Sequence, residues 1–178
     1  MKVLVIPDVH LKPWMFEQAA VLMRAKKADR AVCLMDIPDD WGKEYDIALY
    51  EQTYDAAIDF AKEFPETAWC YGNHDLSYLW HRLESGYSSM AAYTVQRKLL
   101  DLRDTLPENN PICYVQKIDN VLFSHAGVLD YFAESVVPKA NIMTLRQWWR
   151  PLTNSVQTKC GTMPRLFGSD SAFQYAVV

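Results

Sequence analysis

The sequence lacks the long apolar runs that would carry a chain into or across a membrane. Its first apolar stretch covers only Val3 to Ile6 before Pro7 and Asp8 interrupt it, which is unlike the apolar region of a signal peptide. No apolar run approaches the roughly 20 residues of a membrane-spanning helix. We therefore expect a protein without a membrane partner.

Basic clusters and paired cysteines are also missing. The net charge is −4 and no run of Lys or Arg is present, which argues against nucleic-acid binding by electrostatic attraction alone. None of the four cysteines forms a CxxC pair, and Cys33, Cys70 and Cys113 lie in apolar, strand-like segments, whereas Cys160 does not. This pattern predicts buried free thiols in a reducing compartment, and we expect a cytoplasmic protein.

The chain has 178 residues, half of them apolar, which is the size and composition of one globular domain. We see neither an internal repeat nor a linker, so we expect a single domain over residues 1–178.

Apolar periodicity predicts an α/β fold. Strand patterns alternate with helical ones: strands at 1–7, 30–35 and 67–71, and helices at 14–28, 44–64, 76–83 and 89–105. Such alternation predicts a parallel sheet covered by helices. Asp75 is expected to cap the third helix, and Asp119-Asn120 is expected to turn a hairpin between strands at 112–117 and 120–124.

Short polar clusters follow four of these apolar segments, where a strand should end. They are Asp8-Val9-His10, the pair Asp36 and Asp39, Gly72-Asn73-His74-Asp75, and Ser124-His125-Ala126-Gly127. Ligands of open α/β sheets bind beyond the carboxyl ends of the strands. Asp, His and Asn side chains gathered there would form a metal site, and in this number a site for two metals.

Taken singly, each cluster is also typical of an ordinary loop. Asp8 and His10 are two apart, so in an extended segment both can face one ion, but taken alone they are better explained by a strand-ending turn with an incidental His. Asp36 offers a carboxylate that can bridge two ions, although its surroundings are rich in turn residues. Gly72 permits a sharp turn or an unusual backbone angle. The series of clusters favours the functional interpretation.

Imidazole, carboxylate and amide ligands suit Mn, Fe, Zn or Co, and we expect Mn to serve in vitro. Two such ions about 3.5–4 Å apart can stabilise the attacking and leaving oxygens of an in-line displacement, and a water bound to metal ionises near pH 7. The sequence therefore predicts a metal-dependent phosphoesterase.

In this order the clusters resemble the motifs of the calcineurin-like metallophosphoesterase superfamily, which reads D-x-H, G-D-x-x-D, G-N-H-D/E, a single His, and finally G-H-x-H or G-H-T. The form Phe123-Ser-His-Ala-Gly127 is similar to the phosphoprotein-phosphatase and diadenosine-tetraphosphatase branch. The resemblance implies an α/β fold of two packed mixed β-sheets flanked by helices, the α/β/β/α sandwich of that superfamily.

The resemblance also implies a role for each motif residue. Asp8 and His10 would bind the first metal, and Asp36 would bridge to a second. Asn73 and His125 would bind that second metal. His74 would be the general acid that protonates the leaving oxygen, and Asp39 would pair with its imidazole and favour the protonated form.

Three departures from the family pattern stand out. Met35 replaces the usual Gly before Asp36, which is tolerable if the backbone there is ordinary. Asp40-Trp41 replaces an Arg-Gly whose Arg holds phosphate in phosphoprotein phosphatases. Arg150 is a candidate substitute for that phosphate-binding residue, although a surface charge explains it equally well.

The third departure is the absent final motif. The only histidines are His10, His74, His81 and His125, and the chain stops at a strand-like run of residues 173–178. We therefore expect the fold to be C-terminally incomplete, with the second metal short of one imidazole.

The expected substrate is a phosphorylated small molecule, a nucleotide or a phosphoprotein. A different class remains open, a non-catalytic or weakly active phosphate-binding scaffold with an incomplete metal site. A nuclease of the same superfamily is a further alternative, weakened by the missing basic groove.

Overall fold

The structure, a computed structural model, describes residues 1–126. Its centre is a parallel sheet in the order β1-β2-β3, formed by β1 (Val3–Ile6), β2 (Arg30–Cys33) and β3 (Ala68–Trp69). Val3 pairs with Arg30, and Val32 pairs with Ala68. The parallel sheet predicted from the alternating pattern is confirmed.

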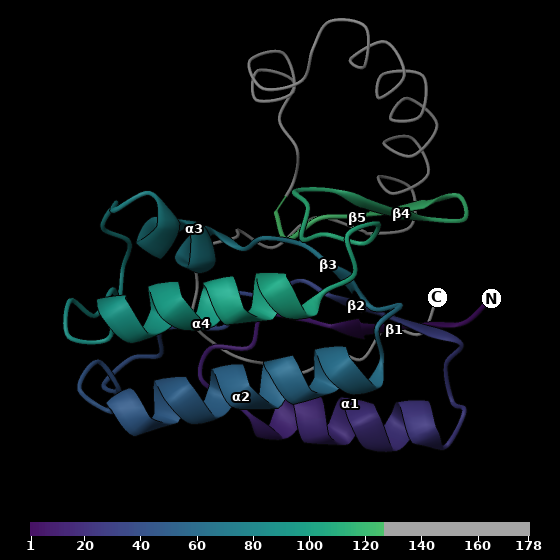
Figure 1. The fold of residues 1–178 in the computed structure, drawn as a ribbon, viewed down its shortest axis with the longest axis horizontal. Coiled ribbons are helices and arrows are strands. Elements are labelled where there is room, and N and C mark those ends of the chain that lie inside the picture. The colour runs from purple at the N-terminus through teal and green to yellow at the C-terminus, as the bar shows by residue number, and fades with distance from the viewer. Residues whose placement is uncertain (127–178) are drawn as a thin grey trace, which may run out of the picture. The chain divides into compact units, whose positions relative to one another are not determined.

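Four helices accompany the sheet: α1 (Trp14–Arg24), α2 (Ile47–Glu63), α3 (Asn73–Leu79) and α4 (Ala92–Thr105). Helix α2 packs between α1 and α4, as Figure 1 shows. Its buried residues recur every three to four positions, as in Tyr50, Tyr54, Ala57 and Ala61, which is the stripe that the sequence predicts. No helix in the described part of the chain is long and apolar enough to cross a membrane.

The alternation of side chains along the strands produces two apolar layers. Leu4, Cys33 and Trp69 belong to the larger core with the helices. Val3 and Val32 belong to a smaller core on residues of the hairpin, among them Ile118 and Phe123. The sheet is therefore buried on both faces, as parallel sheets usually are.

The hairpin consists of β4 (Gln116–Ile118) and β5 (Val121–Phe123), which pair antiparallel around the expected Asp119-Asn120 turn. The backbones of Cys70 and Cys113 pair as an isolated parallel β-bridge, and both thiols are free. Within residues 1–126 the strands form this hairpin and the parallel sheet, and the two mixed sheets of a full sandwich are not seen there. Arg150 and the strand expected at 173–178 lie outside the described residues.

Several expected boundaries were wrong. Helix α2 begins at Ile47 rather than at residue 44, α3 ends at Leu79 rather than at residue 83, and β4 covers Gln116–Ile118 rather than 112–117. Helix α1 ends at Arg24 rather than at residue 28, because Lys26 has a left-handed φ of 53° that a right-handed helix cannot contain. Helix α4 begins at Ala92 rather than at residue 89. Helix α3 begins at Asn73, with Gly72 at its N-cap, so Asp75 lies in the first turn and not at the cap.

The thiols follow the expectation in part. Cys33 and Cys70 are buried free cysteines, whereas Cys113 is half-buried.

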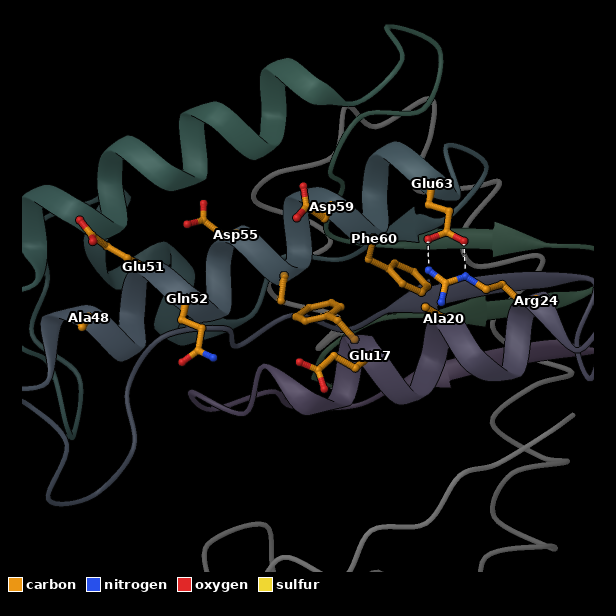
Figure 2. Close-up of a pocket in the computed structure, with 12 residues that line it drawn as sticks. Glu17, Ala20, Arg24, Ala48, Glu51, Gln52, Asp55, Asp59, Phe60 and Glu63 are labelled. Atoms are coloured by element: carbon orange, nitrogen blue, oxygen red, sulfur yellow. Dashed lines mark hydrogen bonds and ion pairs between the residues drawn. The ribbon is translucent and has the colours of Figure 1, made fainter.

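A groove of about 580 Å³ lies between α1 and α2 (Figure 2). Phe16 and Phe60 line it with ring centroids 5.9 Å apart, and Arg24, which also lines it, donates to both carboxylate oxygens of Glu63. None of the predicted metal ligands lines this groove. The site must therefore be found elsewhere, at the strand ends.

Candidate metal centre

Two loops that follow adjacent strands run side by side as an extension of the sheet. The loop after β1 donates three backbone hydrogen bonds to the loop after β2, at 2.7–3.0 Å: Val9 N–H to Met35 O, His10 N–H to Asp36 O, and Leu11 N–H to Ile37 O. These bonds fix the relative position of the first two polar clusters.

Both loops use left-handed backbone. The φ angles are 42° at His10, 59° at Met35, 45° at Asp36 and 65° at Asp39. The condition under which Met35 would be tolerable, an ordinary backbone, is therefore not met, because this region favours glycine and costs other residues free energy. Since His10 is not extended, the expectation that Asp8 and His10 face one ion from a strand was wrong.

The loop after β3 approaches Asp36 as closely as a backbone can. A Cβ placed on Gly72 would lie 1.9 Å from Asp36 Oδ1 and 2.7 Å from its backbone nitrogen. The φ of Gly72 is −90°, which any residue can adopt. Glycine is thus required there for space and not for an unusual angle.

Asp75 fastens the same two loops together from the protein interior. Its side chain is fully buried. Its Oδ2 accepts the backbone N–H groups of Asp36 at 2.8 Å and Gly72 at 3.1 Å, and its Oδ1 accepts Ile37 N–H and the Tyr54 hydroxyl, each at 3.3 Å. Burial and the charge of Asp36 raise the pKa of Asp75 to about 7 against these donors. The sequence pattern did not assign Asp75 this role.

Two groups of potential ligands share Asp36. His10, Asp36 and His74 form one, and Asp8, Asp36 and His125 form the other, with ligand atoms in each group within 4.8 Å of one another. Asp36 is 2% exposed and lies between them. The structure places Asp8 and His10 in different groups, whereas the family resemblance assigns both to the first metal.

His125 is the centre of the second group. Its Nε2 lies 3.1 Å from Asp36 Oδ2 and 3.1 Å from Asn73 Oδ1. Its Nδ1 lies 2.9 Å from the backbone oxygen of Leu34 and 3.5 Å from Asp8 Oδ1. Three side chains, from the ends of β1, β2 and β3, thus meet around the imidazole that follows β5.

His10 and His74 border the other group with their rings edge to face, centroids 5.1 Å apart. His10 Nε2 lies 3.9 Å from Asp36 Oδ2, and its Nδ1 lies 2.8 Å from the backbone oxygen of Asp39. Because Nδ1 is engaged by that backbone oxygen, Nε2 is the nitrogen that is available to bind a metal ion, as is usual for metal-binding histidines.

The pair expected of Asp39 and His74 is present. Asp39 Oδ2 lies 2.9 Å from His74 Nδ1. The other oxygen, Oδ1, accepts the hydroxyls of Tyr50 at 3.0 Å and Tyr78 at 2.5 Å. The sequence did not indicate this role for the two tyrosines, because both are buried helix residues and a buried Tyr is usually interpreted as part of the apolar core.

The charges of these groups shift their pKa values. Burial disfavours the charged imidazole of His74, but the hydrogen bond to Asp39 and the charges of Asp36 and Asp39 outweigh it and raise its pKa. Burial is likewise outweighed at His125, where Asp36 raises the pKa to about 9. Burial works to raise the pKa of Asp36, and the contacts with His125 and His74 lower it overall.

The donor set fits divalent cations. The ion pairs that Asp36 and Asp39 make within residues 1–126 are all with histidines, so the local positive charge depends on protonated imidazoles. Buried carboxylates need a counter-charge, and a divalent ion would supply it while leaving the imidazoles that bind it neutral. Nitrogen and oxygen donors in this mixture match Mn, Fe, Zn or Co.

The profile of the family named calcineurin-like phosphoesterase matches residues 1–166. The chain belongs to the calcineurin-like phosphoesterase family. Searches of curated proteins and of solved structures gave no match. In this calcineurin-like phosphoesterase the match includes the four polar clusters, and divalent metals are typical of the family.

Most of the predicted site residues come together in this calcineurin-like phosphoesterase. The side chains brought together are Asp8, His10, Asp36, Asp39, Asn73, His74 and His125. Arg150, the candidate phosphate-binding residue, lies outside the described residues, so its role stays a prediction.

Proposed function

We propose that this chain is a metal-dependent phosphoesterase that hydrolyses a phosphoester or phosphoanhydride at a centre for two divalent ions. The observation that carries the proposal is the sharing of buried Asp36 by two groups of ligands. A carboxylate with one group on each side is what a bridged pair of ions requires. The motif in which His125 stands supports the phosphoprotein-phosphatase and diadenosine-tetraphosphatase branch.

In the proposed site, His10 and Asp36 would hold one ion, and Asp36, Asn73 and His125 would hold the other. Asp8 lies beside His125 and belongs to the group that would hold the second ion. Bound divalent ions supply a hydroxide at neutral pH and neutralise the phosphoryl charge. A bond forms between phosphorus and the water oxygen, and the bond from phosphorus to the leaving oxygen breaks.

His74 would supply the proton that the leaving oxygen needs. Its Nδ1 is engaged by Asp39, so Nε2 is the nitrogen that can reach a substrate. Its raised pKa favours the protonated imidazole, which is the state that a general acid requires. After the transfer His74 is neutral, and a proton from solvent restores it.

His74 also belongs by geometry to the group with His10 and Asp36, which supports a second candidate role as a metal ligand. Metal content separates the two roles. We propose the acid role because the family resemblance implies it, and because Asp39 lies against Nδ1 of His74 and favours the protonated imidazole.

The test is hydrolysis of p-nitrophenyl phosphate with added Mn²⁺, together with elemental analysis, on wild type and His74→Asn. We expect two metals per chain in both proteins and activity about tenfold lower in the variant. This fall is smaller than the roughly 10²- to 10⁴-fold effect of full acid catalysis, because p-nitrophenolate is a good leaving group. The matched control is His81→Asn, because His81 is exposed and outside both ligand groups.

The outcomes separate the functions. Loss of metal in His74→Asn would assign that residue to the ions and not to proton transfer. Wild type without bound metal or activity, but with affinity for a phosphorylated ligand, would support the scaffold alternative. Activity on a nucleic-acid substrate without activity on phosphomonoesters would support the nuclease.

A further inference from the structure

Asp39 is a buried carboxylate whose two oxygens have different partners. It is 2% exposed. Oδ2 faces His74, and Oδ1 accepts two tyrosine hydroxyls that come from different helices, Tyr50 from α2 and Tyr78 from α3. With Oδ1 fixed by two donors, the carboxylate cannot rotate about its Cβ–Cγ bond without breaking both contacts.

The direction of the Tyr78 hydroxyl is determined by a third group. Ser88 donates its backbone N–H to the Tyr78 oxygen at 2.8 Å. Since that contact uses the oxygen as an acceptor, the single hydroxyl proton is left for Asp39. Ser88 is itself tied to the loop before α2, because its hydroxyl donates to Glu44 O at 2.5 Å.

Both hydroxyls remain protonated in this setting. Burial and the adjacent Asp39 raise the pKa of Tyr50 and that of Tyr78 far above their ordinary value. Both side chains are fully buried, so water does not compete for Asp39. Tyr50 and Tyr78 therefore act as two constant hydrogen-bond donors to Asp39, the carboxylate that contacts the candidate acid His74.

We propose that Tyr50 and Tyr78 are positioning residues for proton transfer by His74: they fix Asp39 so that its free oxygen receives the Nδ1–H and aims Nε2 at the leaving oxygen. The proposal rests on the proposed phosphoesterase function. During the reaction the proton moves from His74 Nε2 to the leaving oxygen as the ester bond breaks, and the tyrosines keep their protons throughout.

A misaligned acid has a specific signature. A good leaving group such as p-nitrophenolate departs with little help, whereas phenolate, whose conjugate acid has a pKa of about 10, needs the proton. Loss of alignment therefore lowers hydrolysis of phenyl phosphate more than that of p-nitrophenyl phosphate. A merely structural defect lowers both by the same factor.

The experiment uses the full chain loaded with Mn²⁺ and compares kcat for the two substrates in wild type, Tyr78→Phe and Tyr50→Phe. We expect phenyl phosphate hydrolysis to fall roughly tenfold in Tyr78→Phe, a fraction of the full effect of an acid, with less than a threefold fall for the nitrophenyl ester. Tyr50→Phe should act in the same direction, and the double variant should exceed either.

Tyr54→Phe is the matched control. Tyr54 is equally buried on α2, but its hydroxyl bonds to Asp75 and not to Asp39. Any fall in this variant should be equal for both esters. An unchanged ratio of the two substrates in Tyr50→Phe and Tyr78→Phe, with wild type active, overturns the positioning role alone.

A second measurement does not depend on turnover. In Zn²⁺-loaded protein the Nδ1–H of His74, observed by ¹⁵N-edited NMR, should move upfield and exchange faster with water in Tyr78→Phe than in wild type. Wild type inactive on both esters overturns the proposed function, and the NMR signal then decides the geometric part of the inference. An identical signal in both proteins overturns it.

Discussion

Gly72 lies so close to Asp36 that no residue other than glycine fits at position 72 while Asp36 keeps its place. A Cβ on residue 72 would lie 1.9 Å from Asp36 Oδ1, well inside any contact distance. The backbone of the Gly72-Asn73-His74 turn can therefore reach the carboxylate, and His74 N–H donates to Asp36 Oδ1 at 2.9 Å.

Gly72→Ala should displace Asp36 and lower metal binding. We expect destabilisation of about 1–3 kcal/mol, the usual cost of a group forced into a packed interior, and bound metal reduced from two ions towards none. Urea unfolding and elemental analysis measure the two effects. Gly42→Ala is the control for metal content: its φ of 75° strains alanine by about 1–2 kcal/mol, but a Cβ there meets nothing within 4 Å, so this variant should lose stability and keep its metal. Full metal content in Gly72→Ala would contradict the prediction.

Asp75→Asn should loosen both ligand loops. The amide replaces one acceptor oxygen by an NH₂ group facing backbone N–H donors, so we expect a loss of about 1–3 kcal/mol and weaker Mn²⁺ binding. Chemical denaturation and a metal titration measure these quantities. Asp46→Asn is matched to it, since Asp46 caps α2 by accepting Leu49 N–H, a role that Asn performs equally well. Equal stability of the two variants would speak against the role of Asp75.

At position 35 the glycine variant should be more stable than the alanine variant, which reverses the usual order of stability. Met35 is fully buried with φ 59°, so truncation to Ala loses about 2–5 kcal/mol of packing and keeps the strained backbone. Met35→Gly loses the same packing but relieves about 1–2 kcal/mol of strain. Urea unfolding should therefore find Met35→Gly more stable than Met35→Ala.

The comparison site is Val32, a buried residue inside β2 with ordinary strand geometry. There Val32→Ala should be more stable than Val32→Gly, because glycine weakens a strand interior. The same order at both sites would show that the left-handed backbone at Met35 carries no cost.

Divalent ions should stabilise the folded chain through Asp36. At 100 times the dissociation constant a single ion adds about 2.7 kcal/mol, which corresponds to about 5–10 °C in Tm for a chain of this size. Asp36→Asn should lose most of that shift, whereas Arg24→Ala, which breaks an exposed pair with Glu63, should retain it. Differential scanning calorimetry with and without Mn²⁺ checks this. A full shift in Asp36→Asn would remove the shared carboxylate from the metal centre.

The sequence predicted the parts of the fold that depend on periodicity and on turn chemistry. The parallel order of β1 and β2, the apolar stripe of α2 and the Asp119-Asn120 turn follow from local patterns. The convergence of Asp8 and Asp36 followed from one further rule, that parallel strands deliver their ends to one edge. His125 follows β5 of the antiparallel hairpin, so that rule does not explain its place beside Asp36.

What the sequence could not supply depends on contacts between distant segments. The left-handed angles at His10 and Met35 arise from the pairing of two loops, and no local signal marks them. The hydrogen bonds of Tyr50 and Tyr78 to Asp39 cannot be predicted from helical periodicity, because the same buried Tyr both packs in the core with its ring and donates with its hydroxyl. Likewise, glycine is required at position 72 because Asp36 occupies the place of a Cβ there, and not because of the turn that Gly72 itself makes.

The backbone bonds that join residues 9–11 to residues 35–37 give these two loops a common register. An insertion or deletion in either one would slip His10 past Asp36 by a whole residue and dismantle both ligand groups at once. Anyone grafting this centre onto another scaffold must transplant the two loops as one unit, with their lengths unaltered.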